Sequence, residues 1–153
     1  MKPIIPAVII VLAAVALLAW GLTAGAVSTQ EVLVTKVIDG DTLIMEGGQS
    51  VRLLGIDADE RGYPCYDEAR IALEKMTLSK RVILEMDRED KDMYGRLLRW
   101  VWVNGTLVNF ELVRSGLAVA RFGSDTDNYE GDIKFAERDA IKAGVGCKWS
   151  SLK

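Results

Sequence analysis

The first part of the chain is an apolar segment without an amphipathic pattern. No charged side chain occurs between residues 3 and 30, and Ile4 to Leu22 is almost entirely apolar. A helix that packs on a protein core shows polar residues every three or four positions, and this stretch shows none. We therefore expect residues 1–26 to form a hydrophobic helix that enters a membrane or the export machinery.

Two fates of this segment remain open. Residues 24–26 (AGA) are a small-x-small sequence of the kind that signal peptidase accepts, which favours a cleaved signal peptide. The apolar run of 19 residues from Ile4 to Leu22 is longer than a usual signal core, which favours a retained membrane anchor. In both cases we expect residues 29–153 to be one domain, either secreted or anchored to the outer face of the cytoplasmic membrane.

Short β-rich runs separated by turn signals follow this segment. The runs combine β-branched residues with apolar alternation, and residues 39–40 (DG), 46–49 (EGGQ) and 104–105 (NG) are typical of turns. The pattern predicts five strands, at residues 31–38, 42–45, 51–56, 81–86 and 96–103.

Apolar residues change to a helical spacing in three later segments. These are residues 66–78, a short helix within 107–117 that ends at Gly116, and residues 129–143, which Gly144 terminates. This order of elements predicts an α+β fold, a five-stranded OB-fold-like β-barrel with three helices packed outside it. Such barrels serve enzymes and binding modules alike, so the fold alone does not decide the function.

Composition excludes several classes of site. Histidine is absent, so no Ser-His-Asp triad, His-containing zinc site or imidazole base can form. The chain carries 19 basic and 22 acidic residues, and removal of Lys2 with the first segment leaves a net charge of −4. Proteins that bind nucleic acid through its backbone alone are normally basic. Affinity for a polyanion must therefore come from a local cluster or from a bound metal.

Two cysteines, Cys65 and Cys147, cannot form a structural zinc site without histidine. In an exported protein a disulfide between them is the expected use, and two free, partly buried thiols are the alternative. Cys65 precedes the first predicted helix and Cys147 follows the last. A bridge would therefore tie the C-terminal end of the chain back to the barrel.

Five polar residues form a candidate catalytic site. Asp41 follows the first turn and Asp57 ends the third predicted strand, so both carboxylates can converge at one barrel edge. Two carboxylates with water and a backbone carbonyl suit Ca²⁺, and less readily Mg²⁺. Glu60 can hold a water beyond the metal, and Arg52 and Arg96 can clamp phosphate oxygens. Such a set can hydrolyse a phosphodiester without histidine.

Each of these segments also has a simpler interpretation when it is taken singly. The acids of the first turn can bond their own backbone, residues 57–60 can be a solvated acidic loop, and arginine stems often cover the edge of a core. Only the combination favours a catalytic site.

The chain resembles the staphylococcal nuclease (thermonuclease) family over residues 32–145, in one collinear order. The matching segments are VIDGDTLIM (37–45), VRLLGIDADE (51–60), DMYGRLLRWVWVNGTLVNFELVRSGLA (92–118) and FAERDAIKAG (135–144). The order and spacing of D-G-D-T, R-L-L-G-I-D-x-x-E and Y-G-R are together highly specific.

The resemblance implies a metal site. Asp41 and Asp57 would bind the metal through their carboxylates, and Ala58 would add its main-chain oxygen. The metal would be Ca²⁺, with Mg²⁺ or Mn²⁺ as alternatives. Asp39 belongs to the same turn and would lie outside the ligand set.

The resemblance also implies the catalytic roles. Glu60 would act as general base or orient the attacking water, and Arg52 and Arg96 would bind the phosphate and stabilise the transition state. Tyr94 would line the phosphate-binding side of the site.

Three departures from the family pattern bear on the substrate. Ala58 and Asp59 stand where the family usually has Thr-Pro, which predicts a looser loop and an added negative charge beside the metal. Met93 stands where a lysine commonly precedes Tyr-Gly-Arg, which removes a phosphate contact. The tyrosines that stack a base in the family are not evident, and residues 121–122 (RF) occupy that region.

We therefore expect a monomeric, metal-dependent nuclease that hydrolyses phosphodiester bonds of DNA, RNA or both outside the cytoplasm, with a membrane contact only if its first segment is retained. The alternative is a non-catalytic nucleic-acid-binding module on the same barrel. A membrane-tethered structural protein is a third possibility, and it gives no reason for Arg52, Glu60 and Arg96 to occur together.

Overall fold

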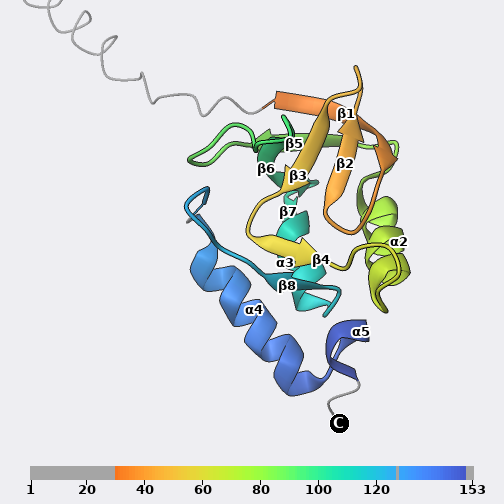
Figure 1. Cartoon of the computed structure of the whole chain (residues 1–153), viewed down its shortest axis with the longest axis vertical. Helices are drawn as coiled ribbons and strands as arrows, with labels where there is room; N and C mark the ends of the chain where they lie inside the picture. The colour runs from red at the N-terminus through yellow and green to blue at the C-terminus, as the bar shows by residue number, and fades with distance from the viewer. Residues whose placement is uncertain (1–29, 127, 151–153) are drawn as a thin grey trace, which may run out of the picture.

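The computed structural model describes residues 30–126 and 128–150 (Figure 1). The predicted hydrophobic helix and the targeting segment 1–26 lie outside these residues and stay predictions. None of the helices in these described ranges has both the length and the hydropathy of a membrane-spanning segment.

Antiparallel strands form most of a closed barrel. Its strands are β1 (Gln30–Val37), β2 (Thr42–Met45), β3 (Ser50–Leu53), β5 (Arg81–Glu85) and β6 (Leu97–Val103). They are hydrogen-bonded in the order β3-β2-β1-β5-β6, and a parallel pairing of β3 with β6 closes the ring. The predicted five-stranded barrel is therefore confirmed. The two-residue strand β7 (Thr106–Leu107) extends β6 through the predicted hairpin at Asn104 and Gly105, whose φ values of 49° and 77° suit a tight hairpin turn.

The third predicted strand, residues 51–56, is wrong in its extent. β3 ends at Leu53, and after a turn the chain starts β4 (Ile56–Ala58), which pairs with β8 (Ala118–Ala120) in a separate two-stranded sheet. Gly55 makes the turn with φ of 70°, and a Cβ at this position would lie 2.4 Å from Cη2 of Trp100. Both the backbone angle and the lack of space require glycine here.

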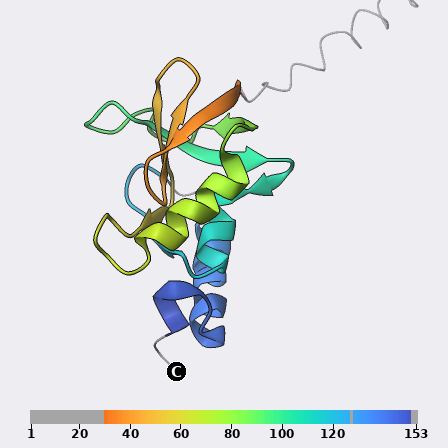
Figure 2. The same ribbon diagram turned by 90° about the vertical axis from the view of Figure 1, so that its right-hand side faces the viewer.

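Three helices pack outside the barrel, as predicted, and a short fourth follows. They are α2 (Tyr66–Thr77), α3 (Val108–Arg114), α4 (Glu130–Ala143) and the one-turn α5 (Gly146–Trp149). In Figures 1 and 2, α2 crosses one side of the barrel, α3 lies at its lower end, and α4 packs outside α3. α4 ends at Gly144, whose φ of 61° allows the left-handed conformation that closes many helices.

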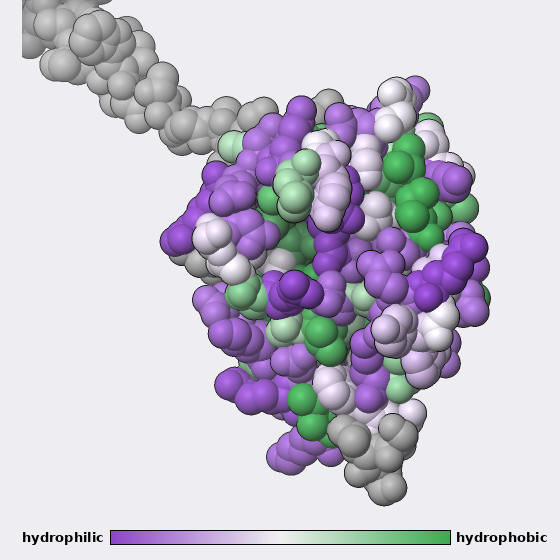
Figure 3. All heavy atoms as spheres, in the orientation of Figure 1, coloured by the Kyte–Doolittle hydropathy of each residue, from purple (hydrophilic) through white to green (hydrophobic). Residues whose placement is uncertain are grey.

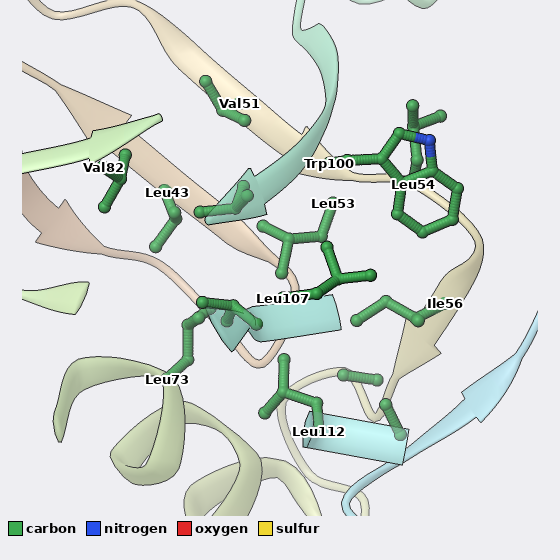
Figure 4. Close-up of a cluster of buried hydrophobic side chains, with 14 of the residues drawn as sticks. Leu43, Val51, Leu53, Leu54, Ile56, Leu73, Val82, Trp100, Leu107 and Leu112 are labelled. Atoms are coloured by element: carbon green, nitrogen blue, oxygen red, sulfur yellow. The ribbon is translucent and has the colours of Figure 1, made fainter. Parts of the chain in front are cut away.

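One hydrophobic core joins the barrel to the helices (Figure 4). Trp100 of β6 is completely buried, and Leu73 of α2 and Leu112 of α3 reach the same cluster from outside the barrel. Burying a side chain of this size contributes about 1.5–3 kcal/mol. Buried Asn109 crosses this core, since its amide donates to the Leu54 carbonyl at 2.9 Å and its oxygen accepts the Val101 N–H at 3.0 Å. Asn109 thereby fixes the start of the turn that separates β3 from β4.

Cys65 and Cys147 form the predicted disulfide. Cys65 immediately precedes α2, and Cys147 lies in α5. The bond therefore ties the C-terminal helix to the segment that leads from the barrel into α2.

We expect this disulfide to contribute about 4 kcal/mol to the free energy of unfolding, because closing a loop of this length lowers the conformational entropy of the unfolded chain. The sequence separation of the two cysteines is 82 residues. The double variant Cys65→Ala/Cys147→Ala should unfold at lower denaturant concentration by a corresponding amount. Reductant should destabilise the wild-type protein and leave the double variant unchanged. Two reactive thiols in unreduced, denatured protein would contradict the assignment.

Candidate active site

The turn between β1 and β2 buries its central acid. The Asp41 N–H donates to Asp39 Oδ1 at 3.0 Å, and the Thr42 hydroxyl donates to Asp41 Oδ1 at 3.1 Å. Gly40 lets this turn approach its neighbours, since a Cβ there would lie 2.6 Å from the Cβ atoms of both Ala58 and Ala69. Burial raises the pKa of Asp39, against the opposing effect of the hydrogen bonds from Thr42. Asp41 is only 6% exposed and is held in a fixed orientation.

Arg52 of β3 connects the two predicted metal ligands. Its Nη2 donates to Asp57 Oδ1 at 2.7 Å and to the Ile56 carbonyl at 3.2 Å, and its Nη1 forms an ion pair with Asp41 Oδ2. This buried Nη1 makes the ion pair without a hydrogen bond of good geometry. Burial lowers the pKa of Arg52, and the Asp57 carboxylate opposes that shift. The structure thus brings Asp41, Asp57 and Arg52 together, as the sequence predicted.

Ala58, the third predicted ligand, lies beside the same pair of acids. Its N–H donates to Asp41 Oδ2 at 2.8 Å, which fixes β4 against the β1–β2 turn. The predicted contribution of its carbonyl to a metal site stays a prediction.

Arg96 lines the same cleft from the position immediately before β6, the strand that pairs with β3. Its Nε donates to Asp92 Oδ2 at 2.6 Å, and Asp92 Oδ1 accepts the backbone N–H groups of Arg96 and Tyr94. Burial opposes ionisation of Asp92, but these hydrogen bonds from Arg96 and Tyr94 outweigh it and lower its pKa. The Arg96 guanidinium lies 5.6 Å from the centre of the Tyr94 ring, which is a cation–π distance. Asp92 therefore sets the direction of Arg96.

A cleft of about 730 Å³ collects the candidate side chains. Its lining includes Asp41, Arg52, Asp57, Glu60 and Arg96. Ala58 and Tyr94 lie next to the cleft and not in its lining. Figure 3, in the orientation of Figure 1, shows a mainly hydrophilic face on which apolar residues appear in small groups.

Two residues of this region were not predicted as part of the site. Arg121 lies directly after β8, and its guanidinium pairs with Asp57 Oδ2 at 3.0 Å. The backbone N–H of Arg121 donates to the Gly55 carbonyl at 2.9 Å. Asp92 ends the charged run at residues 87–92 (DREDKD), whose composition is by itself typical of a solvated loop. The spacing of Asp92 and Arg96 gave a local signal for their pair, whereas no local signal connects Arg121 with a partner 64 residues away.

The expected negative charge of Asp59 does not face the cleft. Its carboxylate accepts the Cys65 N–H at 3.0 Å and pairs with Lys148 of α5. Partial burial opposes ionisation, but Lys148 and the Cys65 N–H lower the pKa of Asp59. Asp59 thus anchors the segment after β4, which had been expected to be loosened by the absence of proline.

The donor set of the cleft suits a hard cation with few protein ligands. No group of three or more acidic, cysteine or histidine side chains in the described parts of the chain is arranged to hold a metal. Asp41 and Asp57 nevertheless both pair with the Arg52 guanidinium. Within the barrel, two negative carboxylates therefore face one positive side chain. Carboxylate oxygens supplemented by water and a main-chain oxygen fit Ca²⁺ or Mg²⁺.

Comparison with known proteins gives the family. Residues 50–151 match the family described as staphylococcal nuclease homologue. The chain is 42% identical to a thermonuclease of Staphylococcus intermedius over 119 residues, covering 72% of this chain and 71% of the relative. It is 34% identical to a thermonuclease of Staphylococcus hyicus over 118 residues, with coverages of 71% and 70%. A protein of Escherichia coli named ParB is 38% identical over 99 residues, covering 57% of this chain and 55% of the relative. With the closed barrel and the cleft described above, these matches establish that the chain belongs to the staphylococcal nuclease family.

Proposed function

We propose that this protein is a metal-dependent nuclease that cleaves nucleic acid in the cleft between Arg52 and Arg96. The class of enzyme follows from the family and from the related thermonucleases: the chain is a hydrolytic nuclease, and its substrate is nucleic acid. The observation that supports the position of the site is the lining of one cleft by two acids, Glu60 and both arginines.

The metal site that we propose consists of the Asp41 and Asp57 carboxylates and the Ala58 carbonyl. Ca²⁺ is the proposed ion, and Mg²⁺ and Mn²⁺ are the alternatives to be compared with it. A bound divalent ion would withdraw charge from a non-bridging oxygen of the substrate phosphate. The acids are pre-positioned for this role, because the Thr42 hydroxyl and the Ala58 N–H orient Asp41.

The remaining side chains of the cleft would bind the phosphate and direct the water. Glu60 is exposed at the cleft, where it can orient a water molecule and accept its proton. Arg96, held by Asp92, and Arg52, held by the two acids, would bind phosphate oxygens and stabilise the charge that develops in the transition state. Tyr94 would support the phosphate-binding side through its contact with Arg96.

The proposed location of the enzyme is outside the cytoplasm. The support is the sequence alone, since Ile4 to Leu22 has no polar face with which it could pack on a barrel. Residues 1–26 would then be dispensable for catalysis.

We expect fractionated cells to contain the protein in the medium or in the membrane. A mature N-terminus at Val27 in the medium would identify a cleaved signal peptide, and an intact Met1 in the membrane fraction would identify an anchor. Intact protein in the soluble cytoplasm would overturn the proposed export. A variant that begins near Thr29 should keep full activity.

Removal of the metal tests the ligand assignment. EDTA should abolish cleavage of DNA and RNA, and addition of Ca²⁺ should restore it, with Mg²⁺ and Mn²⁺ assayed in parallel. Ca²⁺ should also raise the melting temperature, because it binds only the native state. The variant Asp41→Asn should lose this thermal shift. Full activity in excess chelator would refute the metal dependence.

Replacement of Glu60 by Gln or of Arg96 by Ala tests the catalytic roles. Each change should lower kcat on the order of 100-fold or more, as expected for loss of a water-orienting base or of a transition-state contact. The fold should survive, since neither side chain belongs to the buried core. Circular dichroism and thermal unfolding provide the control. Near wild-type turnover of either variant would show that its role is wrongly assigned, and inactivity of the wild-type protein itself would favour the binding-module alternative.

A further inference from the structure

A second hollow lies beside α2 and has no place in the proposed cleavage site. Its volume is about 530 Å³, and it is formed by the end of β1, the segment before α2 and the first turns of α2. Figure 2 shows the side of the molecule on which α2 faces the viewer. Three cationic side chains line it, Lys36, Arg61 and Arg70, against one acid, Asp67. This local excess of positive charge contrasts with the net charge of −3 of the whole chain.

Two of these cations are directed to solvent. Lys36 and Arg61 are both exposed, whereas Arg70 is half-buried and pairs with Glu74 at 2.5 Å. The Arg61 guanidinium lies 5.8 Å from the centre of the Tyr66 ring. The ring is itself fixed, because the Tyr66 hydroxyl donates to the Ile38 carbonyl at 3.2 Å. The pocket therefore exposes the positive charges of Lys36 and Arg61 beside a Tyr66 ring whose position is fixed.

The position of the pocket connects it with the cleft. Glu60 lines the cleft, and the next residue, Arg61, lines the pocket. Likewise, Ile38 lines the pocket and Asp41 of the following turn lines the cleft. Consecutive Cα atoms are about 3.8 Å apart. The walls of the two sites therefore adjoin at residues 60 and 61, so a strand that leaves the cleft can continue into the pocket.

We propose that this basic pocket is a secondary binding site for the phosphate backbone of the nucleic-acid strand that extends from the cleavage site. Lys36 and Arg61 bind backbone phosphates, and the Tyr66 ring beside Arg61 offers a surface to an unpaired base. This inference rests on the proposed function, since it requires a nucleic-acid strand in the adjacent cleft. It explains how an acidic protein holds a polyanion, through a local cluster and not through its overall charge.

The test compares a long substrate with a minimal one. The double variant Lys36→Ala/Arg61→Ala is assayed on single-stranded DNA of about 20 nucleotides, which can reach the pocket with its successive phosphates. It is also assayed on bis(4-nitrophenyl) phosphate, which fills the cleft only. The matched control is Arg138→Ala/Lys142→Ala, which removes the same charge from α4.

We expect the pocket variant to raise KM for the long strand about 10-fold at low salt, with kcat and turnover of the minimal substrate unchanged. The slope of log KM against log salt concentration should fall by about 1.4, or about 0.7 for each single-strand phosphate contact. The control variant should match the wild-type protein on both substrates. An unchanged KM for the long strand, or equal losses on both substrates, would overturn the proposed pocket.

A binding measurement separates this proposal from the proposed catalysis. Fluorescence anisotropy of a labelled strand in EDTA requires no cleavage, so it is informative even if the wild-type protein proves inactive. The pocket variant should bind the strand about 10-fold more weakly than the control variant. Equal affinities would refute the secondary site, whatever the outcome of the activity assays.

Discussion

The sharp turn at Leu54 and Gly55 is the constraint on which the site depends. β3 is paired on both sides, by β2 and by β6, so the chain must leave the barrel before it can supply another wall of the cleft. The indole of Trp100 fills the space that a Cβ at Gly55 would need, and Asn109 binds the Leu54 carbonyl. The turn directs β4 towards β8. Asp57 of β4 thereby lies close enough to β3, the strand that the chain has just left, to accept a hydrogen bond from Arg52.

Charge within the cleft is balanced around one guanidinium. Arg52 contacts both Asp41 and Asp57, so loss of any one of the three leaves the others incompletely paired in a partly buried place. Arg121 adds a second positive charge to Asp57 from the solvent side. A divalent ion between the carboxylates would have to share them with Arg52. Metal binding, as proposed, would therefore be coupled to the freedom of this arginine to bind a phosphate.

The sequence by itself determined the features that depend on local properties of the chain. Alternating apolar residues and turn signals predicted all five barrel strands, and helical spacing predicted the three packed helices. The hairpin at Asn104 and Gly105 was predictable because two adjacent residues supply the backbone angles that it needs. Five charged residues that line the cleft, Asp41, Arg52, Asp57, Glu60 and Arg96, were also named from sequence, although Asp57 lies in β4 and not at the end of a meander strand.

Only the tertiary structure decided the features that depend on segments far apart in the chain. The division of residues 51–56 into two strands requires β8, the three-residue strand with which β4 pairs. Arg121 meets Asp57 across 64 residues, and Lys148 draws Asp59 away from the cleft across 89. The local sequence pattern indicates which segments form strands, helices and turns and where charged residues occur. The distant partners of Asp57 and Asp59, Arg121 and Lys148, are brought to them only by the folding of segments that lie far apart in the chain.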